Sequence, residues 1–311
     1  MNLYNLNKEH SLFLFFFNII VLFTISEFLE LKEIVVPYKT AICFFLISII
    51  GVSHGALDHI KGYRLMKIYK IQNKYFFYPI YIFTCLLVIS FWMIFPLITL
   101  LLFLLVASYH FGKEDSCVGR VIKKKFISIN INILYLFKGS LVVIAPLLLH
   151  TKETLQIFQI LNVDLLLPHE NFLLASLLIS FIANWIIMNR SNNGGFFLAD
   201  WVTILTLNFF LSPLVAFTIY FCFLHSVRHS FGLIYELDKK NFKSGLNSFI
   251  KKAQSLTLVT AILFIFSVYF LTNYYVLDDA ILKVVFIGLA SLTFPHILLE
   301  YLLEKNGKQR N

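Results

Sequence analysis

Long apolar segments separated by short polar ones recur along this chain. A helix that crosses a bilayer needs about 20 mainly apolar residues, and breaking the sequence at charged clusters and at Pro, Asn and Gly leaves ten candidates. They are approximately residues 11–31, 39–60, 75–95, 96–111, 126–149, 170–189, 195–211, 213–233, 254–274 and 279–302. The fourth and seventh are short, so the pattern predicts an all-α, polytopic membrane bundle of about 8–10 transmembrane helices.

Nothing in the pattern indicates a second domain. No repeat or low-complexity segment interrupts the apolar segments, and residues 151–168 mix polar and apolar positions as an interfacial stretch does. The first apolar run is longer than the apolar region of a signal peptide and no A-x-A site follows it, so we expect it to be retained. We therefore predict one membrane-embedded domain over residues 1–311.

Composition supports lipid as the surrounding solvent. Of the 311 residues 59% are hydrophobic and only 14% are charged, whereas a soluble domain carries about 25% charged residues to solvate its surface. An ordinary water-soluble enzyme is thereby excluded. The same apolar excess also offers surroundings for an apolar substrate.

The basic residues predict the orientation of the segments. The net charge is +9, and 20 of the 26 Lys and Arg lie before the first segment, after the last, or in the alternate loops between. Only Lys32, Lys39 and Lys152 lie in the opposite loops. Basic loops remain cytoplasmic, so we predict a multi-pass protein of the inner cell membrane with both termini in the cytoplasm. The charge then marks loops and does not indicate binding to nucleic acid.

Histidines concentrate near the ends of the even-numbered segments, which approach one membrane depth. They are His54 and His59 in the second segment, His110 in the fourth, His225 and His229 in the eighth, and His296 in the tenth. An ionisable residue at membrane depth is by default a functional hypothesis.

Four of these histidines form a candidate metal site. His225 and His229 are four residues apart, which on a helix places both imidazoles on one face about 5–6 Å apart at Cβ. His54 and His110 offer two further nitrogens at the matching depth. Imidazole binds Fe, Zn, Cu and Ni alike, so the pattern leaves the metal open.

The neighbouring polar residues have alternative roles. Asp58 and Glu114 each follow a histidine by four residues, where a carboxylate can accept the second ring N–H of a metal ligand, or else cap a helix or pair with a loop lysine. His59 and His296 are alternative ligands, or else residues that contact the ligands without binding the metal. Arg228 is expected to extend to the interface by snorkelling, without a catalytic role.

Four segments, taken in order, resemble the Brp/Blh family of β-carotene 15,15′-dioxygenases, membrane enzymes that supply retinal to microbial rhodopsins. The segments are His-Gly-Ala-Leu-Asp-His (54–59), Tyr-His-Phe-Gly-Lys-Glu-Asp (109–115), His-Ser-Val-Arg-His-Ser (225–230) and Phe-Pro-His (294–296). The resemblance extends over about residues 40–303. It implies one iron, Fe(2+), held by His54, His110, His225 and His229, with no catalytic residue beyond the metal centre.

The reaction that the resemblance implies is cleavage of the central double bond of all-trans-β-carotene with O2 into two all-trans-retinals. A carotenoid is dissolved in the bilayer, where apolar walls can orient it and exclude water. The expected partners are therefore β-carotene, O2 and membrane lipid, with a functional link to a retinal-binding rhodopsin.

Two other classes of membrane protein compete with this interpretation. A desaturase- or hydroxylase-like enzyme with two irons would need more clustered histidines than this chain has. A transporter would be expected to keep acid–base pairs at the bilayer middle, which only Lys138, Asp200 and Lys283 approach, and a cytochrome would show the Soret band of haem. Iron content and the absorption spectrum separate these classes.

Overall fold

The computed structural model describes residues 3–28, 38–116, 129–166, 168–191 and 194–308, and this part of the chain is helical without a β-strand. The helices are α1 (Leu3–Phe28), α2 (Lys39–Leu46), η1 (Ile47–Gly51), η2 (Val52–Leu57), α3 (Asp58–Ile68), η3 (Lys74–Phe76), α4 (Phe77–Ile94), α5 (Pro96–Glu114), α6 (Ile131–Gly139), α7 (Leu141–Leu149), α8 (Thr151–Ile160), α9 (Glu170–Arg190), α10 (Phe196–Phe210), α11 (Pro213–Ile219), η4 (Tyr220–Ser226), α12 (Val227–Leu237), α13 (Phe242–Leu271) and α14 (Leu277–Lys308).

Helices occupy all ten of the predicted apolar segments, as far as those segments are described. Seven helical runs among the described residues are long and apolar enough to cross a membrane: 39–68, 74–94, 96–114, 131–149, 170–190, 242–271 and 277–306. The prediction of an all-α polytopic membrane bundle is thereby confirmed. The helix α10 is apolar but shorter, so the number of crossings beyond seven stays a prediction.

Local sequence explains where several helices begin. Pro96 and Pro213 occupy the first turns of α5 and α11, where the missing N–H would have no helical partner in any case. Asn130 caps α6 by accepting a hydrogen bond from the backbone N–H of Asn132 at 3.0 Å, and Asn241 caps α13 in the same way. The helix boundaries therefore follow ordinary capping chemistry.

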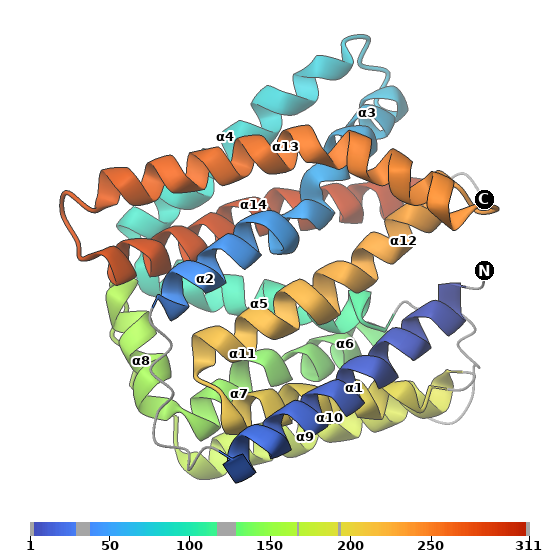
Figure 1. The fold of residues 1–311 in the computed structure, drawn as a ribbon. Helices are drawn as coiled ribbons and strands as arrows, with labels where there is room; N and C mark the ends of the chain where they lie inside the picture. The colour runs from blue at the N-terminus through green and yellow to red at the C-terminus, as the bar shows by residue number, and fades with distance from the viewer. Residues whose placement is uncertain (1–2, 29–37, 117–128, 167, 192–193, 309–311) are drawn as a thin grey trace.

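The beginning of α1 and the end of α14 lie at the same end of the bundle (Figure 1).

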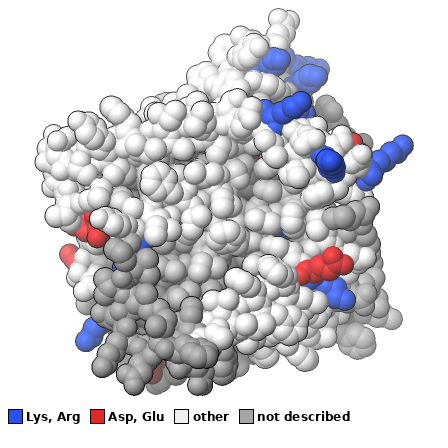
Figure 2. Space-filling view, in the orientation of Figure 1, with Lys and Arg blue, Asp and Glu red and all other residues white. Residues whose placement is uncertain are grey.

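Figure 2 shows that the middle of one face carries almost no charged residues, while Lys and Arg gather toward the end near α3 and the C-terminus. Exposed basic residues in these helices and turns are Arg64, Lys67, Lys70, Lys74, Lys239, Lys240, Lys243, Lys251, Lys252 and Lys305. Such a bare middle is what lipid contact requires, and large apolar side chains such as Phe83, Leu258 and Phe266 are exposed on the bundle. The cations Lys32, Arg120 and Lys123–Lys125 lie outside the described residues.

Two glycines bring α5 and α6 into backbone contact. A Cβ atom on Gly112 would lie 1.8 Å from the carbonyl oxygen of Tyr135, and one on Gly139 would lie 1.9 Å from that of Ser108. Small residues allow this close approach of membrane helices. The contact places Lys138 of α6 beside the C-terminal end of α5, which carries several of the polar residues described below.

Two π-helical turns lie against each other at the centre of the bundle. The hydroxyl of Ser226 in η4 donates to the carbonyl of Gly51 in η1 at 3.0 Å, and a Cβ on Gly51 would lie 2.6 Å from the ring of Phe221. The sequence pattern predicts ordinary helix in both segments, whereas the structure widens one turn in each. Such π turns occur frequently at functional sites, and His225 lies within η4.

Candidate metal centre

Four buried histidine rings from four helical elements form a contiguous row. His225 of η4 lies 5.3 Å from His110 of α5, His110 lies 5.3 Å from His296 of α14, and His296 lies 5.8 Å from His229 of α12, measured between ring centroids. The side chains of His110, His225, His229 and His296 are all at most 6% exposed. Helices distant in sequence therefore converge on one imidazole-rich centre.

A carboxylate accepts a hydrogen bond from the Nδ1 of three of these rings. The pairs are His225 with Asp115 at 3.1 Å, His229 with Glu114 at 3.2 Å, and His296 with Asp58 at 2.8 Å. An ionised carboxylate only accepts hydrogen bonds, so Nδ1 of the neutral ring carries the proton and Nε2 presents its lone pair. Carboxylates hold metal-binding histidines in this tautomer in many proteins. The three rings therefore present the kind of nitrogen that binds a metal ion.

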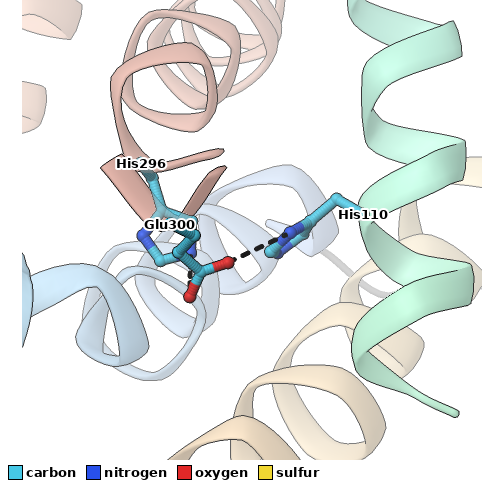
Figure 3. Close-up of side chains that lie close together, drawn as sticks. All are labelled: His110, His296 and Glu300. Atoms are coloured by element: carbon cyan, nitrogen blue, oxygen red, sulfur yellow. Dashed lines mark ion pairs between the residues drawn. The ribbon is translucent and has the colours of Figure 1, made fainter. Parts of the chain in front are cut away.

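A fourth carboxylate lies between two of the histidines (Figure 3). Glu300 Oε2 is 3.9 Å from His110 Nδ1, and Glu300 Oε1 is 3.7 Å from His296 Nε2. Ligand atoms of His110, His296 and Glu300 all lie within 4.8 Å of one another. Lys61 pairs with Glu300 at 2.7 Å, so the carboxylate is held at the edge of the histidine row.

The structure brings together three of the four predicted ligands, His110, His225 and His229. The side chain of His54 lies outside the described part of the structure, although its backbone belongs to η2. The sequence offered His59 and His296 as alternative ligands, and of these two His296 lies within the row. The other alternative, His59 of α3, is half-buried, and its Nδ1 contacts the carbonyl of Ala56 in the preceding η2 at 2.9 Å.

Asp58 and Glu114 do orient histidines: Asp58 pairs with His296, and Glu114 pairs with His229 rather than with His110 as its spacing predicted. The side chain of His54, the predicted partner of Asp58, lies outside the described part of the structure. Both observed pairs join helices far apart in the chain, so spacing within one helix does not predict them. Capping of a helix end was the alternative role for both carboxylates, but the hydrogen bonds that they form are to histidine rings.

The sequence reasoning missed Asp115 and Glu300. Asp115 closes the segment Tyr-His-Phe-Gly-Lys-Glu-Asp, and its carboxylate also accepts a hydrogen bond from the Tyr220 hydroxyl at 2.8 Å. Glu300 follows His296 by four residues on α14, the spacing that places two side chains on one helix face. That spacing was an available signal for Glu300, whereas Asp115 meets His225 only through the fold.

The expectation that Arg228 reaches the membrane interface is wrong. Its guanidinium is buried and donates to both carboxylate oxygens of Asp200 at 2.9 Å, to Ser11 at 2.5 Å and to the carbonyl of Asp115 at 3.3 Å. The Nζ of Lys138 donates to the same carbonyl at 3.3 Å. Two buried cations thus hold the backbone of the residue whose carboxylate orients His225, and pairing with Asp200 compensates the desolvation of Arg228.

We expect Asp115→Asn to lower the metal affinity of the purified protein about 10- to 100-fold, because an amide no longer fixes the tautomer of His225. Competition with a chromogenic chelator measures this affinity. The matched variant Tyr220→Phe removes the other hydrogen bond to Asp115 while keeping the carboxylate, and should cost less than about 10-fold. Equal affinities for Asp115→Asn and the wild type would show that the carboxylate does not orient the ring.

Comparison with known proteins gives consistent results. A family model described as β-carotene 15,15′-dioxygenase matches residues 45–304. A protein named beta-carotene 15,15'-dioxygenase from the uncultured marine bacterium 66A03 is 29% identical over 265 residues, covering 82% of this chain and 90% of that relative. No solved structure is significantly similar to this chain. The matched residues include the whole histidine row and its four carboxylates.

Proposed function

The chain belongs to the β-carotene 15,15′-dioxygenase family, and we propose that its buried histidine row is the iron centre at which the carotenoid is cleaved. The reaction breaks the central double bond of β-carotene and adds one atom of O2 to each of the two carbons that it joined, so the products are two retinals. The observation that supports this use of the site is the set of buried imidazoles held on Nδ1 by carboxylates.

We assign the iron to His110, His225 and His229, with His54 as the further ligand that the family resemblance implies. Iron bound by imidazoles supplies the redox chemistry that O2 activation requires. The carboxylates around the iron site would position its histidine ligands. Asp115 and Glu114 hold the rings of His225 and His229 from α5, so two helices must pack correctly before the ligands are aligned.

Aromatic side chains pack around His225, at one end of the histidine row. The ring of Phe111 meets His225 edge-on with centroids 4.7 Å apart, and Phe221 stacks on His225 at 5.9 Å with an interplanar angle of 13°. Phe217 stacks in turn on Phe221 at 5.4 Å. A rigid apolar polyene is compatible with such walls, which supply orientation and a dry environment for oxidation.

We further propose that the basic end of the bundle faces the cytoplasm and that the protein resides in the inner cell membrane. Exposed lysines gather at the end that holds both termini, in agreement with the retention of basic loops in the cytoplasm. The carotenoid then reaches the site from the lipid phase. A retinal-binding rhodopsin in the same membrane is the natural consumer of the product.

Expression in a bacterial host that accumulates β-carotene tests the proposed function. We expect the cells to lose their orange colour and to accumulate retinal in proportion to the carotene lost, with an empty-vector strain as the control. Products identified by chromatography and mass spectrometry report the cleavage position. Unchanged carotene at normal protein levels, or two apocarotenals of unequal length, would contradict central cleavage by this chain.

A further inference from the structure

Glu300 differs from the other carboxylates near the histidine row in what it faces. Asp58, Glu114 and Asp115 each accept a hydrogen bond from an Nδ1 at 3.2 Å or less. Glu300 instead lies beside ring nitrogens of two histidines at 3.7 and 3.9 Å. Its side chain is 12% exposed, so it is part of the buried site and not of the surface.

These two distances are too long for hydrogen bonds, which join N and O at about 2.7–3.2 Å. They are close to the separation of two atoms that bind one ion, since ligand atoms about 2.1 Å from a metal at a tetrahedral angle lie about 3.4 Å apart. The two distances involve different oxygens of Glu300, but one ligand atom from each of Glu300, His110 and His296 lies within 4.8 Å of the others, so the three residues are close enough to share one ion. A modest closure of the side chains would bring them to bonding distance of one ion.

Charge also favours a carboxylate at this position. A divalent cation bound only by neutral imidazoles keeps its full charge in a buried site, which is costly unless a counter-charge lies close by. The other three carboxylates are engaged with Nδ1 atoms. Lys61 pairs with Oε1 of Glu300 at 2.7 Å, and the other oxygen, Oε2, faces His110 Nδ1 at 3.9 Å. A mixed set of histidine and carboxylate ligands with an open position is also typical of non-haem Fe(II) oxygenases.

The same helix contains a second ion pair that serves as an internal comparison. Glu304, one turn beyond Glu300 on α14, pairs with Lys113 at 2.6 Å, and its side chain is 41% exposed. The two pairs have the same chemistry and similar geometry. Of the two, the Glu300 pair is the one that is more buried and adjoins the histidine row, so a difference between the variants reports what this buried position beside the histidines adds to ion pairing.

We propose that Glu300 is a carboxylate ligand of the iron, positioned by Lys61. The proposal rests on the proposed function, because it concerns the ion bound at the same histidine row. It changes the expected ligand set from histidine alone to histidine with one carboxylate. His296, with its Nδ1 on Asp58, lies next to Glu300 and completes the polar wall on the α14 side.

The test compares Glu300→Gln with Glu304→Gln in purified full-length protein. Iron per chain, Fe(II) affinity by chelator competition and the visible absorption of Co(II)-substituted protein are measured, none of which depends on turnover. We expect Glu300→Gln to weaken metal binding at least about 10-fold and to change the Co(II) bands, while Glu304→Gln matches the wild type. Because the single change leaves Lys61 without its partner, the double variants Lys61→Met/Glu300→Gln and Lys113→Met/Glu304→Gln are compared in the same way.

Each outcome decides a separate point. Wild-type affinity and an unchanged Co(II) spectrum in a folded Glu300→Gln or Lys61→Met/Glu300→Gln protein would overturn the ligand role and leave the iron centre intact. Equal losses in the Glu300 and Glu304 variants would likewise overturn it, because the effect would then come from ion pairing alone. Absence of iron from active wild-type protein would overturn the proposed centre itself.

Discussion

His225→Ala and His229→Ala should each reduce retinal formation to less than about 1% of the wild-type level in carotene-producing cells. Each ring is buried and is held by its own carboxylate, so alanine at either position removes an oriented ligand. We expect the same loss for His110→Ala and His54→Ala. The measurement is retinal per unit of protein, together with iron per purified chain, since removal of a ligand should lower both.

The chain offers a control within one of the same motifs. His59 lies in the segment 54–59 but is half-buried and turned toward the carbonyl of Ala56, so His59→Ala should keep both activity and iron. Protein levels are matched by immunoblot of the membrane fraction. A histidine variant that retained near-normal retinal formation at equal protein level would not be a ligand.

Arg228→Met should destabilise the fold by about 3–5 kcal/mol, because it leaves the Asp200 carboxylate buried without its counter-charge. Arg228 and Asp200 are each 3% exposed, and the pair connects α12 with α10, while Ser11 adds α1. Thermal unfolding of the detergent-solubilised protein should show a markedly lower Tm. The abundance of the variant in membranes should fall accordingly.

Two further variants separate charge from packing. Arg228→Met/Asp200→Leu removes both charges and should recover much of the lost stability, since a buried ion pair can be exchanged for apolar residues at little cost. Arg228→Lys keeps the charge but cannot form the two-pronged contact with Asp200, so it should be intermediate. A single Arg228→Met variant as stable as the wild type would show that this ion pair does not stabilise the bundle.

Much of the fold follows from the one-dimensional pattern because lipid imposes a simple condition on each segment. Every crossing must be apolar and must satisfy its own backbone hydrogen bonds, so the apolar segments predict a bundle of about 8–10 helices without knowledge of their neighbours. The turn chemistry of Pro96, Pro213 and Asn130 is equally local. The π turn that contains His225 was not predictable in this way, because it arises where Phe221 packs against Gly51 of another segment.

The sequence by itself determined the helical membrane class, the ends of the segments at which histidines gather, and the candidate ligands His54, His110, His225 and His229, with His296 as an alternative. These features depend on composition, on period and on spacing within one helix. Only the tertiary structure decided which carboxylate meets which histidine, that Arg228 is buried against Asp200, and that Glu300 adjoins His110. Those contacts join helices far apart in the chain, and their geometry is set by close approaches such as that of Gly112 and Gly139, which spacing along one helix does not encode.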